Sequence, residues 1–242
     1  SFYFCDANIN IFSFCNSFEK RMFRNNYYKI KKMGLLPLHH KQTHKMKTII
    51  KQSLAKSYTY QEYRNQVSTL LKEGKSTGNE QSADLTHYSE LNEVRMNRLD
   101  KTMVVPEENI KRLQEINSEM IWLVISEGWC GDAAQILPII HKMAEQSEKI
   151  DLKIVFRDEN EELMNLFLTN GTKSIPKLIV LDKNSLEVLG DFGPRPTEAK
   201  QLILDYKATH GVVDETAKTE LQKWYLHDKG LSTQREILEL VK

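Results

Sequence analysis

Trp129-Cys130-Gly131-Asp132-Ala133 is the stretch on which the prediction of the fold depends. An uninterrupted apolar run at residues 121–125 precedes it and predicts a strand that is buried on both faces. Beyond it, apolar residues recur at the spacing of one helix face as far as about Ser147. Cys130 is therefore expected where a buried strand leads into a helix N-terminus, whose unpaired N–H groups and dipole favour an anion. There the thiol either becomes a reactive thiolate or fills space beside the strand end, and the local pattern leaves both interpretations open.

The overall composition is that of an ordinary soluble protein. Of the 242 residues, 28% are charged and 40% are hydrophobic, and the net charge of +1 gives no general argument for binding nucleic acid or a membrane. Residues 1–47 contain nine Lys or Arg against two Asp or Glu, so the rest of the chain is acidic. No apolar stretch approaches the roughly 18 residues of a membrane helix. We therefore expect neither a nucleic-acid partner nor a membrane partner.

Residues 1–45 differ in composition from the rest of the chain. They hold six of the nine Phe, together with many Asn, Lys and Tyr, and no strand or helix period persists in them. We interpret them as a leader that is either disordered or upstream sequence read through by a gene model, with Met46 as the expected true start. The His and Cys residues of this segment match no recognised zinc spacing, so no metal site is predicted; they are Cys5, Cys15, His39, His40 and His44.

Cysteine usage restricts the chemistry and the compartment. Of the three cysteines, only Cys130 lies outside the leader. One thiol excludes a disulfide framework in the body of the protein and suits a reducing compartment, so we expect a cytoplasmic protein. No phosphate-binding or dinucleotide-binding glycine motif is present, and no cofactor is predicted.

Beyond the leader, the hydrophobic pattern predicts alternating helices and strands. We expect strands at 121–126, 152–156, 178–181 and 186–189, the last two joined by a short hairpin turn. We expect helices at 57–73, 89–101, from Pro106 onward, and at 130–147, 161–168, 196–207, 214–228 and 233–241. Asn160 is a predicted N-cap, and Thr233 with Glu236 forms a capping-box pattern for the last helix. This order implies parallel pairing of the first strands, an antiparallel edge hairpin and helices on both faces of the sheet.

Three features of the sequence resemble the thioredoxin family. Trp129-Cys130-Gly131 opens the family's Trp-Cys-Gly-x-Cys site. Pro138 stands where the family kinks its active-site helix, and a Pro inside any helix removes one backbone hydrogen bond. Ser174-Ile175-Pro176 stands where the family keeps a cis-proline that faces the thiol.

The resemblance covers about residues 105–210 and implies a thioredoxin-like α/β fold, with a central mixed sheet flanked by helices. Residues 46–104 and 211–242 are then helical N-terminal and C-terminal extensions. The whole body from Met46 resembles a bacterial thioredoxin-like subgroup of unassigned activity with a single-cysteine site. The motifs that carry this narrower resemblance are Arg95-Met96-Asn97-Arg98-Leu99-Asp100-Lys101, Cys130-Gly131-Asp132-Ala133 and Phe192-Gly193-Pro194-Arg195-Pro196.

Two departures separate this chain from dithiol thioredoxins. Ala133 holds the position of the resolving cysteine, so no disulfide can form within the site. The family's usual cycle needs that second thiol to release the substrate from a mixed disulfide. Val124 stands where many thioredoxins bury an Asp that assists proton transfer. Both differences argue against a general protein-disulfide reductase.

The resemblance implies a site in which Cys130 is the catalytic residue. A single thiolate can attack a disulfide and be released by an external thiol, or be oxidised to a sulfenic acid and reduced again. We expect Trp129 to cover the site and the backbone at Ile175 to pair with an extended substrate peptide. The full set of predicted substrate-binding residues is Trp129, Gly131, Asp132, Ile175 and Pro176.

The neighbouring charges are harder to interpret. Asp132 in the first helical turn stabilises the helix dipole by about 0.3–1 kcal/mol, but it also repels a thiolate and raises the thiol pKa. We favour the helix role and, on balance, a reactive thiol with a lowered pKa. Arg157-Asp158-Glu159 is interpreted as a solvated loop, and Arg195 as an exposed turn residue rather than an anion ligand. Trp224-Tyr225 is expected to dock the C-terminal extension on the core.

Two functions of different classes remain open. One is a monothiol redox enzyme or thiol-dependent sensor, which the presence of Cys130 supports. The other is a thioredoxin-fold interaction module without chemistry, which Ala133 and Val124 support. The expected partner is a thiol or disulfide substrate, either a protein or a small molecule. The sequence defines neither that substrate, nor its reductant, nor the oligomeric state.

Overall fold

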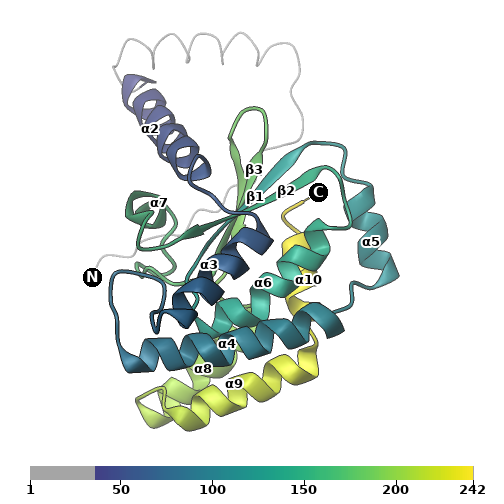
Figure 1. The fold of residues 1–242 in the computed structure, drawn as a ribbon. Helices are drawn as coiled ribbons and strands as arrows, with labels where there is room; N and C mark the ends of the chain where they lie inside the picture. Colours follow the sequence, from purple (N-terminus) through teal and green to yellow (C-terminus); the bar gives the residue numbers. More distant parts are fainter. Residues whose placement is uncertain (1–35, 242) are drawn as a thin grey trace, which may run out of the picture. The chain divides into compact units, whose positions relative to one another are not determined.

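The computed structural model describes the backbone of residues 36–241 and the side chains from residue 43. The chain divides into two compact units, Ser1–Met46 and Lys47–Lys242. The second unit contains the sheet and all the helices that follow α2 (Leu36–Leu54) (Figure 1). Most of the predicted leader, including Cys5 and Cys15, therefore lies outside the described residues. The last residues of that leader, from Leu36, belong to α2.

A four-stranded mixed sheet forms the centre of the second unit. Its strands are β1 (Met120–Ser126), β2 (Ile150–Phe156), β3 (Lys177–Asp182) and β4 (Val188–Phe192), in the order β2-β1-β3-β4. β1 pairs with β2 in parallel, and β3 is antiparallel to both β1 and β4. All seven residues of β1 are buried, as the uninterrupted apolar run predicts for a central strand covered on both faces.

Helices flank this sheet and extend it at both ends of the chain. The helices within the predicted core are α5 (Glu107–Gln114), α6 (Gly131–Ala144), α7 (Glu161–Leu166) and α8 (Thr197–His210). The additional helices are α3 (Tyr60–Lys72), α4 (Ala83–Thr102), α9 (Glu215–Asp228) and α10 (Leu231–Leu238). α6 contacts β2 and is also in contact with α4, α5 and α10. The predicted α/β fold with extra terminal helices is therefore confirmed.

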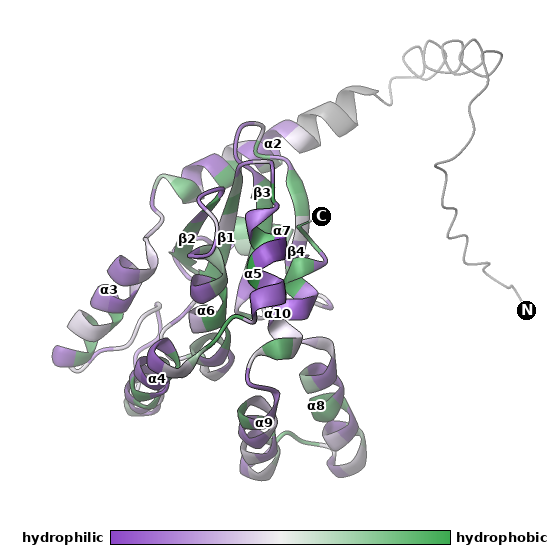
Figure 2. Cartoon of the chain, turned by 90° about the vertical axis from the view of Figure 1, so that its right-hand side faces the viewer, coloured by the Kyte–Doolittle hydropathy of each residue, from purple (hydrophilic) through white to green (hydrophobic). Residues whose placement is uncertain are grey.

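The hydrophobic residues gather along the strands of the sheet, whereas outer helices such as α5 are mostly hydrophilic (Figure 2). The fully buried side chains include Trp122, Leu137 and Ile154, which come from β1, α6 and β2. Each strand thus contributes to one core beneath α6. In the part of the chain that the structure describes, no helix is long and apolar enough to cross a membrane.

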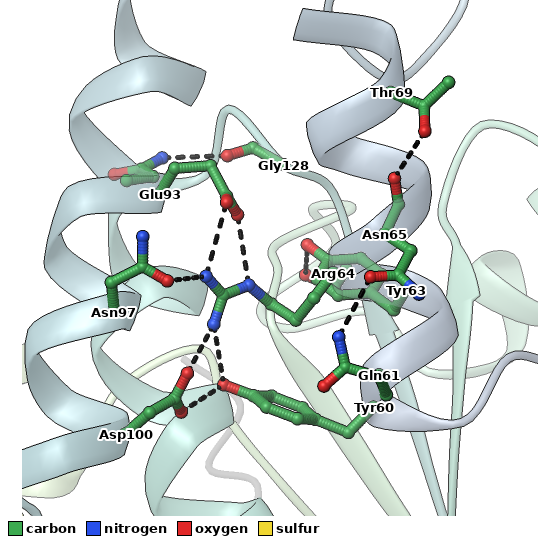
Figure 3. A network of polar contacts seen from close by, with 12 residues as sticks. Tyr60, Gln61, Tyr63, Arg64, Asn65, Thr69, Glu93, Asn97, Asp100 and Gly128 are labelled. Carbon is green, nitrogen blue, oxygen red and sulfur yellow. Dashed lines mark hydrogen bonds and ion pairs between the residues drawn. The ribbon is translucent and has the colours of Figure 1, made fainter.

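A polar network holds α3 against α4, and through α4 against α6 (Figure 3). Its centre is Arg64, whose side chain is only 8% exposed. The guanidinium donates to Glu93 Oε1 at 3.0 Å, to Asp100 Oδ2 at 2.5 Å and to Asn97 Oδ1 at 2.7 Å. Tyr60 also donates its hydroxyl to Asp100 Oδ1 at 2.7 Å. The 95–101 motif of the sequence therefore supplies two of the groups that satisfy a buried cation.

Several predicted boundaries and caps are wrong, for local reasons. α4 begins at Ala83, six residues before the predicted start, because Ser82 caps it by accepting from the N–H of Leu85 at 3.2 Å. β4 begins at Val188 rather than at Leu186, since Leu186 has a φ of 56° and belongs to the turn. Asn160 does precede α7, but its side chain donates to the carbonyl of Phe156 at 2.9 Å instead of capping.

The predicted capping box of the last helix does not form. Gly230 is the N-cap of α10, and the hydroxyl of Thr233 is buried inside the helix without a hydrogen-bond partner. Glu236 instead accepts from the backbone N–H of Thr197 at 2.7 Å. Its carboxylate therefore caps the start of α8, a different helix, where it satisfies one of the unpaired N–H groups.

Candidate functional site

Cys130 lies at the junction that the sequence predicts. It is the N-cap of α6, directly after the turn that follows β1, and its Sγ accepts from the N–H of Ala133 at 3.5 Å. The thiol also donates to the carbonyl oxygen of Ile175 at 3.3 Å. The Ile175–Pro176 peptide bond is cis and directly precedes β3. The fold thus brings the thiol beside the backbone of Ile175, 45 residues further along the chain.

The thiol is buried, and this changes the expected acidity. Cys130 is 8% exposed. Burial, and secondly the charge of Asp132, raise the pKa of the thiol to about 12, although the N–H groups of Ala133 and Asp132 and the cation of Arg195 oppose them. The prediction of a lowered pKa is therefore wrong for the free protein, because desolvation exceeds the effect of the helix N-terminus.

Asp132 does not point into solvent but forms an ion pair with Arg195. The guanidinium Nε donates to Asp132 Oδ1 at 2.9 Å, and Nη2 lies 2.7 Å from Oδ2, which is a two-point carboxylate contact. The hydroxyl of Tyr225 on α9 also donates to Oδ1 at 3.0 Å. Arg195 is therefore not an exposed turn residue, as the sequence suggested, and Tyr225 does dock the C-terminal extension on the first turn of α6.

The ring of Trp129 is held by a residue that directly follows β2. The guanidinium carbon of Arg157 lies 4.9 Å from the centroid of the Trp129 ring, within the range of a cation–π contact. Arg157 donates to Asp158 at 2.8 Å, and Asp158 accepts from the backbone N–H of Asn79 at 3.1 Å. Arg157 and Asp158 are therefore part of the support of the site and not a solvated loop as we expected, whereas Glu159 is exposed.

The sequence analysis missed a buried carboxyl group next to the site. Glu127, three residues before the thiol, is fully buried. Its Oε1 accepts from the N–H of Asp158 at 3.0 Å, whereas Oε2 has no hydrogen-bond partner. Burial raises the pKa of Glu127, and this exceeds the lowering by hydrogen bonds to Thr77 and Asp158. A carboxylate directly after an apolar strand is the sequence signal that marks such a residue.

A pocket of about 490 Å³ opens next to the loop that carries Cys130. Its wall comes from α4, from the first residues of α6, from Arg195 and from α9. Three of the predicted substrate-binding residues, Trp129, Gly131 and Asp132, border this pocket, whereas Cys130, Ile175 and Pro176 do not line it. The thiol of Cys130 instead contacts the carbonyl of Ile175. Arg95 on α4 also lines the pocket, and the sequence analysis assigned it no role.

Part of the chain matches a known protein family. The model of a protein family described as thioredoxin matches residues 78–210, which is more than half of the chain. The protein therefore belongs to this thioredoxin family. The match includes all of α4, which we had expected to lie outside the thioredoxin-like domain. No curated protein matches the chain.

Two solved structures are similar to this chain. One is the crystal structure of an HIV epitope scaffold, with 23% identity over 72% of this chain and 96% of that chain and a TM-score of 0.47. The other is a protein of unknown function from Pseudomonas aeruginosa, with 20% identity over 76% of this chain and 97% of that chain and a TM-score of 0.46. Neither similarity indicates an activity.

Proposed function

We propose that this protein catalyses thiol–disulfide exchange with Cys130 as its single reacting thiol, as a member of a single-cysteine Cys-Gly-Asp-Ala subgroup of thioredoxin-like proteins. One observation carries the proposal: Cys130 Sγ lies at the N-cap of α6 and 3.3 Å from the carbonyl oxygen of Ile175. A thiol at a helix N-terminus beside a backbone carbonyl suits attack on a disulfide held alongside it. Within the described residues, Cys130 is the free cysteine of the chain.

The exchange proceeds in two balanced steps. Cys130 loses its proton, and the thiolate attacks one sulfur of a disulfide RS–SR, forming Cys130–S–SR and releasing RS⁻, which takes up a proton. A second, external thiolate then attacks the sulfur of R in the mixed disulfide, releasing the thiolate of Cys130. The sum is RS–SR + R′SH → RSH + R′S–SR, so the substrate disulfide is the oxidant, the external thiol is the reductant, and Cys130 returns unchanged. Ala133 makes the external thiol obligatory, since it leaves no internal thiol to do this step.

The raised pKa of Cys130 determines how the rate of exchange depends on pH. In the free protein the thiol is protonated at neutral pH, because burial disfavours the thiolate. Arg195 counteracts this through its positive charge, and its own carboxylate partner Asp132 works in the opposite direction. Exchange is therefore expected to accelerate as pH rises, and to depend on the balance between these two side chains. An external thiol as reductant also suits a reducing compartment such as the cytoplasm.

The second candidate is an interaction module that retains the fold without the chemistry. The burial of Cys130 and its raised pKa are the observations that favour it. Under this alternative, partners bind along the backbone at Ile175 and no covalent adduct forms. The two candidates differ in one observable property, which is whether Cys130 forms a mixed disulfide.

The experiment uses the full-length chain with Cys5→Ser and Cys15→Ser, so that Cys130 is the only thiol. The protein is incubated with the neutral disulfide of mercaptoethanol, and intact mass is followed over time at several pH values. We expect one added mercaptoethanol group per chain, faster formation at higher pH, and its loss when glutathione is added. The matched control carries Cys130→Ser as well and gains no mass. Absence of any adduct, in folded protein whose thiol reacts normally after denaturation, would favour the interaction module.

A further inference from the structure

Arg95 is the cation of the pocket that lacks an anionic partner. Its Nη1 donates to Asn92 Oδ1 at 2.5 Å, and Asn92 in turn donates to the carbonyl of Gly128 at 2.9 Å. The amide thus anchors the guanidinium to the thiol loop without neutralising it. Among the residues that the structure describes, Arg95 forms no ion pair, although its side chain is partly buried. A half-buried guanidinium with unused N–H donors favours a bound anion.

The other charges of the pocket are already paired. Arg195 is held by Asp132, with Nη2 and Oδ2 2.7 Å apart. Lys218 on α9 pairs with Glu215 at 2.6 Å and lies over the ring of Tyr88. The pocket therefore has one positive charge in excess, and Arg95 carries it. Burial, followed by repulsion from Arg98, lowers the pKa of Arg95, while the charge of the nearby Asp132, already paired with Arg195, opposes this. An anion bound at Arg95 would oppose the lowering further.

Gly131 lets this cation lie beside the loop that carries the reacting sulfur. A Cβ atom added at Gly131, the residue after Cys130, would lie 3.9 Å from Arg95 Nη1, with nothing nearer. No side chain therefore stands between the guanidinium and the loop that carries the thiol. A group bound by Arg95 lies within the reach of a few bonds from Cys130, which is the span of a small thiol with an acidic group.

We propose that the pocket between α4 and α9 is a carboxylate subsite, in which Arg95 binds the acidic end of a small thiol or disulfide whose sulfur exchanges with Cys130. The inference rests on the proposed function, because it names the substrate class of that reaction. The planar guanidinium donates two parallel hydrogen bonds to a carboxylate, which fixes direction as well as charge. The pocket volume of 490 Å³ accommodates a molecule of a few tens of atoms at most.

The test compares three disulfides of similar size and different charge on the full-length chain with Cys130 as the only thiol. They are dithiodipropionate with two carboxylates, hydroxyethyl disulfide without charge, and cystamine with two ammonium groups. Each rate of adduct formation is divided by the rate at which the same disulfide is reduced by dithiothreitol, a neutral thiol, which removes differences in intrinsic reactivity. We expect the normalised rate for dithiodipropionate to exceed that for cystamine by about tenfold or more.

Arg95→Gln should abolish most of this preference, with little change in the normalised rate for hydroxyethyl disulfide. The matched control is Arg98→Gln, which removes the same charge from the same helix but lines a different pocket. It should leave the preference within about twofold of the unaltered value, because Arg98 is exposed and does not line this pocket. Equal loss in both variants would overturn the subsite and indicate only a general positive potential.

A second readout does not depend on the chemistry. Thiodipropionate is a thioether with the same two carboxylates and cannot exchange, so its binding is followed by NMR through the indole signal of Trp129, which borders the pocket. We expect saturable shifts that weaken by about tenfold in Arg95→Gln but not in Arg98→Gln. If no disulfide reacts while thiodipropionate binds at Arg95, the proposed function fails and the subsite stands. If all disulfides react at equal normalised rates and thiodipropionate does not bind, the subsite is refuted and the exchange activity stands.

Discussion

Arg64 and Arg95 are two partly buried arginines on neighbouring helices, and they have opposite surroundings. Arg64 on α3 meets the carboxylates of Glu93 and Asp100 and the amide of Asn97 (Figure 3). Arg95 on α4 meets one amide, that of Asn92. The first guanidinium has its charge and most of its donors satisfied within the protein, whereas the second has neither. The difference separates a cation that holds the fold together from one that is available to a ligand.

The same difference applies to the carboxylates near the thiol. Asp132 receives three hydrogen bonds from Arg195 and Tyr225, while Glu127 is fully buried with one oxygen unpartnered. Burial alone therefore does not identify a functional group here. What distinguishes the candidate site is that incompletely paired groups, Glu127 and Arg95, flank the loop that carries Cys130.

The largest expected effect is on stability, and it comes from Arg64. Replacing Arg64 by Met leaves the carboxylates of Glu93 and Asp100, whose side chains are 19% and 29% exposed, without their cation. We expect the free energy of unfolding to fall by about 2–3 kcal/mol, somewhat less than for a fully buried pair. Urea denaturation followed by far-UV circular dichroism measures this change.

The comparison substitution is Arg95→Met, which removes a guanidinium that is less buried than that of Arg64. We expect its free energy of unfolding to change by less than about 0.5 kcal/mol, because no carboxylate loses a partner. Similar losses in the two variants would contradict the distinction between the two arginines. If the loss of unfolding free energy in Arg64→Met is also below about 0.5 kcal/mol, the network of Figure 3 contributes little to stability.

A smaller effect, on reactivity, extends the comparison to a third arginine. Asp132→Asn removes the carboxylate that pairs with Arg195. Arg195 then has no ion-pair partner, which is already the situation of Arg95. Because Asp132 raises the pKa of Cys130 and Arg195 lowers it, the pKa should fall in this variant, so more thiolate is present at a given pH. We expect alkylation of Cys130 near neutral pH to accelerate about tenfold, which corresponds to a fall of about one unit in the pKa of the thiol.

The control for this change is Arg195→Gln, which removes the opposing charge. The pH profile of its alkylation rate should move to higher pH, because the cation that stabilises the thiolate is lost while Asp132 remains. Profiles that move in the same direction in both variants would show that loop disruption, and not charge, controls the thiol. Urea denaturation of both variants establishes that each is folded under the conditions of the rate measurement.

The sequence predicted the sheet and most helices, because apolar periodicity is a local signal. The meeting of Cys130 with Ile175 was predicted by the resemblance to the thioredoxin family. It did not predict the Asp132–Arg195 ion pair, whose members are 63 residues apart, or the pocket between α4 and α9. The ion pair depends on how the turn before α8 packs against α6, and the pocket depends on how the extensions pack. Glu236 shows the same limit, since a carboxylate in a local capping pattern caps another helix when that helix is brought close enough.

The central claim is that Cys130 exchanges disulfides without a second protein thiol, and steady-state kinetics test it most directly. With Cys5→Ser and Cys15→Ser in the full-length chain, the rate of exchange between hydroxyethyl disulfide and glutathione is measured while both concentrations are varied. The account predicts acceleration over the spontaneous reaction, parallel lines in double-reciprocal plots as expected of a covalent intermediate, and loss of the acceleration in Cys130→Ser. A rate equal to the spontaneous one, or the same acceleration in Cys130→Ser, would contradict it.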